Sequence, residues 1–243
     1  MQSVGGAHSI GVALFVSAVV AIIPGQFGGV AAAGTIDIWS QAGSGSNSQN
    51  LPNVSISASP VWAVPTTSDY QWISYTDTGC DLFSVTTGRC TPGPGNPVGT
   101  PVGGPPTASF YQTFTLSTAS TGTLDVWADD TAGVWLDTGA VTTGTGTGGT
   151  MLIAPNGTLG TNCAGGPIGC LPGMDAALPL SLAAGTYTIV VDAYQLVGGS
   201  PFGVMYDGTL SSSAGTVPEP ASYALMALGL AGLGAMVLRR KRV

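Results

Sequence analysis

Short segments that alternate between apolar and polar residues dominate this chain, and none of them has the spacing of an amphipathic helix. Every second residue is apolar within residues 124–128 and 187–193, and within residues 110–116 with the exception of Gln112. A period of two sends neighbouring side chains to opposite faces of a strand, so each segment predicts a strand with one buried face. Weaker candidates bring the total to roughly eight or nine strands: residues 35–39, 54–57, 70–75 and 202–206.

Two low-complexity stretches separate these candidate strands. Residues 91–106 are rich in Pro and Gly, and residues 142–150 consist of Thr and Gly. Neither stretch has the apolar content to fold alone, so both predict long surface loops. Many short strands joined by such loops predict an all-β fold for residues 34–215, namely an antiparallel β-sandwich of jelly-roll type.

The N-terminal segment has the features of a secretory signal peptide, with one departure. Residues 10–23 form an apolar run that is too short to span a bilayer, and three Ala follow at residues 31–33. The departure is that residues 1–9 contain no Lys or Arg. We expect a signal peptide over residues 1–33, cleaved after Ala33; a buried core helix is the alternative.

The C-terminal segment has three parts in a fixed order. Pro218, Glu219 and Pro220 come first, residues 221–238 are apolar or small, and a basic cluster follows. As a helix, residues 221–238 would be roughly 27 Å long, close to the thickness of the hydrocarbon core of a bilayer. We therefore expect a transmembrane helix whose basic end stays cytoplasmic, which places the central domain outside the inner membrane. The basic cluster consists of Arg239, Arg240, Lys241 and Arg242.

This tail, residues 217–243, resembles the PEP-CTERM sorting signal. The resemblance implies a Gram-negative bacterium that makes exopolysaccharide, and processing by an exosortase near Pro218, Glu219 and Pro220. It also implies a route from the inner membrane to the cell surface or extracellular matrix. A plain C-terminal membrane anchor is the alternative.

A second resemblance covers part of the central domain. Residues 110–114, 124–130 and 134–137 together resemble galactose-binding-like and PA14-like sandwiches. Those domains end the last hairpin in Asn-Gly, where this chain has Asp137, Thr138 and Gly139. The resemblance implies a sandwich and says little of a ligand, because one fold hosts many functions.

The four cysteines form two pairs that are local in sequence. We favour disulfides Cys80–Cys90 and Cys163–Cys170, because export makes oxidation favourable and each pair encloses a short loop. Two other connectivities are possible. A zinc site is the rival reading, although neither spacing is Cys-x-x-Cys and no His lies nearby.

The distribution of charge excludes several function classes. Arg89 is the one basic residue between the two ends, His8 is the only His, and Glu219 is the only Glu. The central domain therefore lacks the residues of a Ser-His-Asp triad, a His-based zinc site or a Schiff base. Its acidic surface would repel nucleic acid. We expect a protein that is not an enzyme and does not bind nucleic acid.

One group of acids predicts a metal site. If residues 124–137 form a hairpin, Asp129 and Asp130 lie in its turn, and Asp125 and Asp137 lie on the flanking strands. Clustered Asp oxygens with backbone carbonyls suit Ca²⁺. The alternative is that these Asp are turn residues whose side chains bond the local backbone.

Trp127 and Trp135 are candidates for stacking on sugar rings, and core packing is the alternative. The first hypothesis for function is a non-catalytic surface or matrix protein whose sandwich binds polysaccharide. The second is a structural or adhesive coat protein without a defined ligand. The third is a matrix-polymer hydrolase, which requires two Asp carboxyls about 5–10 Å apart in an open groove.

Overall fold

The predicted strands are present in the computed structural model, which describes residues 34–49, 51–95, 97–141, 148–156, 166–198 and 201–212. No α-helix occurs in this part of the chain, and hence no helix that is long and apolar enough to cross a membrane. The expected signal peptide, residues 1–33, and the tail with its helix 221–238 lie outside the described residues. Their boundaries stay predictions.

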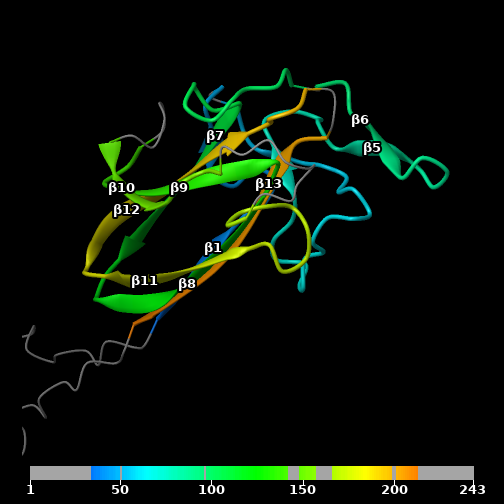
Figure 1. Ribbon diagram of the computed structural model, residues 1–243. Helices are drawn as coiled ribbons and strands as arrows, with labels where there is room; N and C mark the ends of the chain where they lie inside the picture. Colours follow the sequence, from blue (N-terminus) through cyan, green and yellow to red (C-terminus); the bar gives the residue numbers. More distant parts are fainter. Residues whose placement is uncertain are drawn as a thin grey trace, which may run out of the picture. The chain divides into compact units, whose positions relative to one another are not determined.

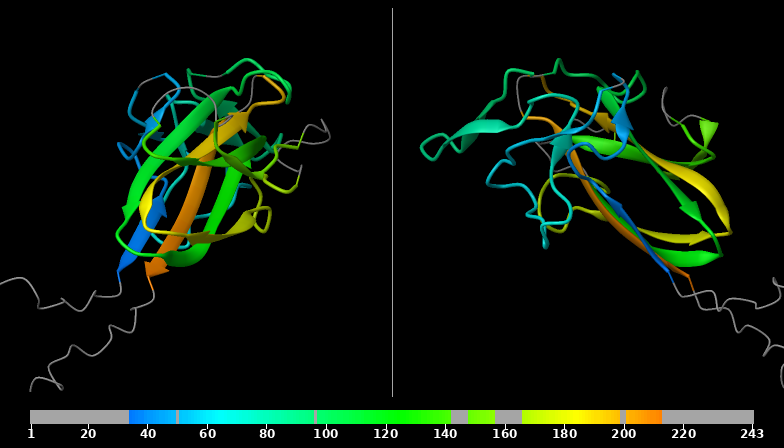
Figure 2. Two further views of the ribbon diagram at one scale, coloured as in Figure 1. Left: turned by 90° about the vertical axis from the view of Figure 1, so that its left-hand side faces the viewer. Right: turned by 180° about the vertical axis from the view of Figure 1, so that it is seen from behind.

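The first of two antiparallel sheets, sheet A, is built around β13. One edge of β13 pairs with β8, which in turn pairs with the edge strand β11. The other edge of β13 is shared by β1 and β4, and β3 pairs with β4. The views in Figure 2 show β1 and β13 side by side. The bounds are β1 Thr35–Trp39, β3 Val54–Ser55, β4 Ile73–Ser74, β8 Ser120–Asp129, β11 Ala176–Leu182 and β13 Gly203–Ser212.

The second sheet, sheet B, has the strand order β10-β9-β12-β7-β2 and lies face to face with sheet A (Figure 1). A separate two-stranded hairpin, β5–β6, projects from the sandwich. The bounds are β2 Ser46–Asn47, β5 Cys80–Ser84, β6 Arg89–Pro92, β7 Ala108–Leu116, β9 Thr131–Thr138, β10 Thr150–Ile153 and β12 Gly185–Tyr194. Together the strand pairings confirm the expected antiparallel β-sandwich.

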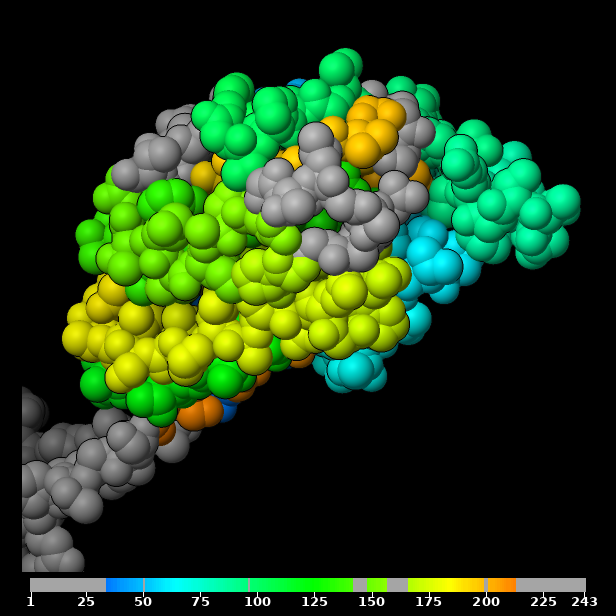
Figure 3. Space-filling view, in the orientation of Figure 1, coloured from blue at the N-terminus to red at the C-terminus, as the bar shows by residue number. Residues whose placement is uncertain are grey.

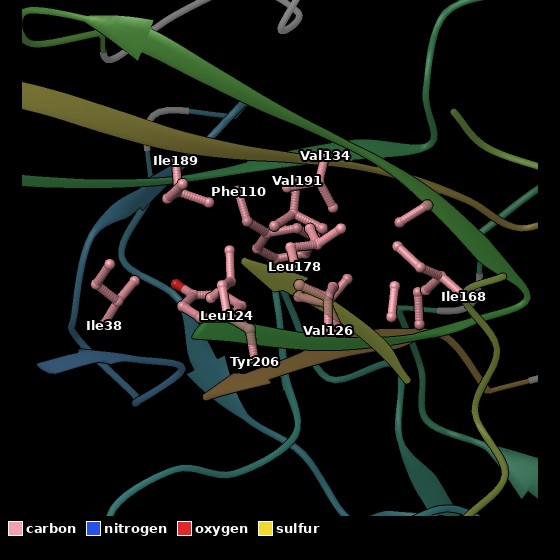
Figure 4. Close-up of a cluster of buried hydrophobic side chains, with 14 of the residues drawn as sticks. Ile38, Phe110, Leu124, Val126, Val134, Ile168, Leu178, Ile189, Val191 and Tyr206 are labelled. Carbon is pink, nitrogen blue, oxygen red and sulfur yellow. The ribbon is translucent and has the colours of Figure 1, made fainter. Parts of the chain in front are cut away.

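The core lies between the two sheets and follows the alternation seen in the sequence. Leu124, Val126 and Ala128 of β8 are fully buried, whereas Asp125 and Trp127 between them face outwards and stay partly exposed. Burial of a Val or Leu side chain contributes about 1.5–3 kcal/mol each. Side chains from both sheets meet in this layer, as Figure 4 shows for Phe110, Val191, Leu178 and Tyr206, among others.

A smaller core covers part of the outer face of sheet A. Trp62 and Trp72 lie at its centre with their ring centroids 4.3 Å apart, and both are buried. The Trp72 indole Nε1 donates to the carbonyl oxygen of Ala63 at 2.9 Å. Met205 of β13 packs into this cluster from the sheet. The segment before β4 therefore folds back over the sheet instead of running free.

The expected hairpin through residues 124–137 is wrong. β8 belongs to sheet A and β9 to sheet B, and the chain crosses between the sheets at Asp129 and Asp130. Each strand pairs with partners distant in sequence: β8 with β11 and β13, β9 with β10 and β12. The connection is as short as a hairpin turn, but it joins two layers of the sandwich.

The Cys80–Cys90 disulfide is confirmed, with the two Cα atoms 5.2 Å apart at the base of the β5–β6 hairpin. Cys170 is also disulfide-bonded. Its expected partner, Cys163, lies outside the described residues, so that pairing stays a prediction. The described cysteines include no free thiol.

Candidate functional site

An open groove of about 610 Å³ runs beside the base of the β5–β6 hairpin. Its lining combines apolar side chains, hydroxyl groups, one aromatic ring and two carboxylates. Sites for small polar ligands commonly have such a mixed lining with a few placed polar groups. The lining residues are Leu51, Pro52, Val54, Ser55, Ser57, Tyr75, Thr76, Asp77 and Asp81.

Two backbone contacts bring the three stretches of the groove together. β3 pairs with β4 through Val54 and Ser74, which sets residues 51–57 beside residues 75–77. The backbone N–H of Cys80 then donates to the carbonyl oxygen of Ser57 at 2.7 Å. Gly79 permits this approach, because a Cβ at that position would lie 2.7 Å from the Ser57 backbone. Asp81 follows directly and joins the groove.

Tyr75 forms the aromatic part of the groove and is held from two sides. Its ring centroid lies 6.0 Å from that of Phe202, and its hydroxyl donates to the carbonyl oxygen of Gly95 at 3.4 Å. Burial raises the pKa of the Tyr75 hydroxyl above its ordinary value. The ring therefore stays a neutral, half-buried surface at physiological pH, fit to contact the C–H face of a ligand.

Asp77 and Asp81 supply the charged acceptors of the groove. Both side chains are exposed to solvent. The backbone around Asp77 is fixed by a hydrogen bond from the Gly95 N–H to the Asp77 carbonyl oxygen, at 2.8 Å. Carboxylates form strong hydrogen bonds with hydroxyl and ammonium donors. The groove can therefore accept hydrogen bonds from a polyhydroxylated ligand while Val54, Pro52 and Tyr75 contact its apolar face.

Of the four acids expected to bind Ca²⁺, the structure brings only Asp129 and Asp130 together. Asp125 lies on the outer face of sheet A, and Asp137 lies in sheet B. Along an extended strand, four residues span about 13 Å and seven about 23 Å, so the outer two acids cannot reach the crossover. No group of three or more His, Cys, Asp or Glu is placed to hold a metal ion among the described residues.

The Asp129 and Asp130 pair is buried at the crossover between the sheets. The pKa of Asp129 is well above its ordinary value because of burial first, and because of the adjacent charge of Asp130 second. The Asp130 carboxylate accepts hydrogen bonds from the backbone N–H groups of Leu196 at 2.8 Å and Val197 at 3.3 Å. This pair therefore ties the crossover to the segment after β12.

The remaining two acids have unrelated surroundings. Asp137 is buried next to Gly149, and burial raises its pKa. Asp125 is partly exposed and lies directly opposite Asp207 of β13. Its pKa is raised by burial first, and then by the charges of Asp175 and Asp207.

The two expected stacking residues lie outside the groove. Trp127 is half-buried against the smaller core, and its ring is stacked on Tyr70 at a centroid distance of 6.4 Å. Trp135 of β9 is also half-buried, opposite Met151 on one neighbouring strand and Val190 on the other. A role for either in stacking on sugars stays a prediction.

The residues that the sequence did not single out are Tyr75, Asp77 and Asp81. The only local signal was the alternation around residues 70–75 and the turn formed by Asp77, Thr78 and Gly79. The groove itself depends on contacts between residues that are distant in sequence.

Comparison with known proteins identifies the tail. The family model of the PEP-CTERM protein-sorting motif matches residues 216–242. The chain carries a PEP-CTERM motif. The match confirms the resemblance of residues 217–243 to the PEP-CTERM sorting signal. A PEP-CTERM tail implies an exported protein that an exosortase processes. No curated protein matches the chain.

Three solved structures show weak likeness to this chain. A family 35 carbohydrate-binding module from Clostridium thermocellum is 10% identical, with a TM-score of 0.35 over 72% of this chain and 97% of that one. The GH26-CBM35 β-(1,4)-mannanase of Podospora anserina is 12% identical, with a TM-score of 0.32 over 76% of this chain and 29% of that one.

The third is the K1 cleaved adhesin domain of Lys-gingipain from Porphyromonas gingivalis W83. It is 14% identical, with a TM-score of 0.32 over 74% of this chain and 91% of that one. Because these TM-scores are low, the assignment of the sandwich fold depends on the strand pairing described above and not on these likenesses.

Proposed function

We propose that this chain is an exported surface or matrix protein whose jelly-roll-type sandwich binds polysaccharide without catalysis. The PEP-CTERM tail supports export, with an inner-membrane stage before processing by exosortase and a surface or matrix location after it. The groove lined by Tyr75, Asp77 and Asp81 is the observation that carries the binding role. A purely structural coat protein would need no such site.

In this reading the sugar rings lie along the open groove. Their C–H faces contact Tyr75, Val54 and Pro52, and their hydroxyl groups donate to the carboxylates of Asp77 and Asp81. An open groove suits a polymer, because the sugar rings do not have to be enclosed on all sides.

Hydrolysis is the second candidate, because two carboxylates share the groove. A glycosidase uses one such group as a desolvated acid. Asp77 and Asp81 are both exposed to solvent, which supports binding over catalysis. Release of reducing ends from a bound polymer, abolished by Asp81→Asn, would establish hydrolysis instead.

Retention of residues 34–215 on the host's own exopolysaccharide tests the binding role. We expect retention in affinity electrophoresis, and at least about tenfold weaker binding for Asp77→Asn combined with Asp81→Asn, since two charge-assisted hydrogen bonds are lost. Asp37→Asn combined with Asp175→Asn removes two acids outside the groove and serves as the control matched in charge. Absence of retention, both with Ca²⁺ and with a chelator, would overturn the proposal.

A further inference from the structure

The β5–β6 hairpin has a fully exposed face. Residues opposite each other in antiparallel strands share a face, and the register pairs Leu82 with Thr91 and Ser84 with Arg89. All four side chains are exposed, Leu82 to 72%. Val85, the next residue at the tip, is 87% exposed. We call these five residues the hairpin face, and Figure 3 shows the hairpin standing out from the surface.

Arg89 gives the hairpin face the one positively charged side chain of the sandwich. The other four basic residues of the chain are residues 239–242 of the tail. Arg89 forms no ion pair with any carboxylate of the described residues. A guanidinium binds carboxylates through its planar fork and stacks on aromatic rings. The hairpin face therefore fits a partner surface that is acidic and partly aromatic.

The outer face of sheet A beside the smaller core is acidic and partly aromatic, with Trp39 packed against that core. Asp207 of β13 lies opposite Asp125 of β8 on one side and opposite Trp39 of β1 on the other. Asp37 lies one row further along β1, opposite Thr209. We call Asp37, Trp39, Asp125 and Asp207 the acidic face; the first is exposed and the other three are partly exposed.

Among the described residues the one basic side chain is Arg89 on the hairpin, so the two sheets contain no cation that compensates the charges of the acidic face. Like charges directly opposite in neighbouring strands destabilise a sheet. The pKa of Asp207 is raised by burial first, and also by Asp37 and Asp69, while a hydrogen bond from Trp39 lowers it. A cation from outside would remove this repulsion.

We propose that the hairpin face of one copy of this chain docks on the acidic face of a second copy. The Arg89 guanidinium then binds the carboxylates of Asp125 and Asp207 and stacks on Trp39. Leu82 and Val85 lose their exposure against the outer face of sheet A. Charge complementarity selects a second copy as the partner, because the described part of each chain carries one basic side chain, the exposed Arg89, and one row of opposed carboxylates.

The two faces differ, so the contact is heterologous. Each copy keeps a free hairpin at one end and a free acidic face at the other, and repeated contacts form open chains. Such self-assembly suits a matrix component, and it does not depend on the binding of polysaccharide in the groove.

Sedimentation velocity of the full chain in a mild detergent tests the contact. We expect association that rises with protein concentration and weakens at least about tenfold in Arg89→Gln and in Leu82→Ser. Thr115→Glu changes the net charge by the same one unit as Arg89→Gln, on an exposed strand position of sheet B, and should leave association unchanged. Asp77→Asn, in the groove, should also leave association unchanged.

Mixing two variants, each with one defective face, distinguishes a heterologous contact from other modes of self-association. Arg89→Gln keeps its acidic face, and Asp125→Asn combined with Asp207→Asn keeps its hairpin face. Each should be monomeric alone, and together they should form one-to-one dimers that do not grow. The Asn variant should melt no lower than the wild type, which excludes misfolding. Wild type that stays monomeric, association unaffected by Arg89→Gln, or a mixture without dimers would each overturn the proposal.

Discussion

Removing the Cys80–Cys90 disulfide tests whether the β5–β6 hairpin folds independently of the sandwich core. The relevant change is Cys80→Ser with Cys90→Ser, which leaves the second disulfide intact. The two cysteines are separated by 10 in sequence. In the chain-entropy model, closing a loop of that length stabilises the folded state by about 2.7 kcal/mol. For a domain of this size that corresponds to a fall in melting temperature of about 5–11 °C if the hairpin stays folded.

We expect a smaller global effect, because the hairpin is held by little besides the disulfide. Two-stranded hairpins are marginally stable in water, and Leu82, Ser84 and Arg89 all point into solvent. Without the bond the hairpin should open in the native state. The open hairpin then gives the native state most of the chain entropy that loss of the disulfide gives to the unfolded state. The melting temperature should therefore fall by less than half of about 5–11 °C.

Hydrogen exchange followed by mass spectrometry measures both effects in one sample. Amides of β5 and β6 should lose their protection in the double variant, while amides of β8 and β13 keep theirs and serve as the internal control. A hairpin that keeps full protection while the melting temperature falls by the whole 5–11 °C would refute this reasoning. It would show that contacts with the sandwich support the hairpin.

Three further changes test the electrostatics and the close packing of sheet A. Asp129→Asn should raise the melting temperature at pH 7 but not at pH 3. The pKa of Asp129 is raised in the folded state, so the wild type loses stability as the pH rises above the ordinary value of 3.8. The same dependence of melting temperature on pH in wild type and variant would contradict this. Asp207→Asn should lower the pKa of Asp125, followed by NMR titration, and stabilise the domain by up to about 1 kcal/mol at low salt. Gly122→Ala should cost more than about 3 kcal/mol in urea unfolding, since its Cβ would lie 1.8 Å from the Thr209 carbonyl oxygen.

The alternation of residues predicted the strands well, because side-chain direction is a local property. Residues 110–116, 124–128 and 187–193 all lie within strands of the sandwich, and their apolar positions face the core. The partners of each strand are not local. β8 pairs with strands that begin at Ala176 and Gly203, and nothing within residues 120–129 specifies them.

The wrong hairpin shows where this limit lies. A short connection between two strands has the same sequence pattern whether the strands are neighbours in one sheet or belong to two sheets that face each other. The strand pairings distinguish the crossover, and so does the burial of Asp129 and Asp130, which a solvent-exposed hairpin turn would not require. The expected Ca²⁺ group depended on that hairpin and separated with it.

The groove could not be predicted from the sequence, for a similar reason. Tyr75 was part of a candidate strand, and Asp77 and Asp81 looked like ordinary surface acids. Their proximity to Ser57 arises from the pairing of β3 with β4, one backbone hydrogen bond and the absence of a side chain at Gly79. A sequence reports that a glycine is present, whereas the approach that the glycine permits appears only in the structure.

The opposition of Asp125 and Asp207 follows from the core and cannot be relieved within the sheet. Val204, Tyr206 and Leu210 of β13 face inwards and are buried. A shift of one residue would bring Asp207 into the core and expose those three side chains, so the register is fixed by burial. With that register, Asp207 must lie opposite Asp125 on the outside. Protonation, substitution or an external cation can remove the repulsion, and in the sandwich only Arg89, on the projecting hairpin, offers such a cation.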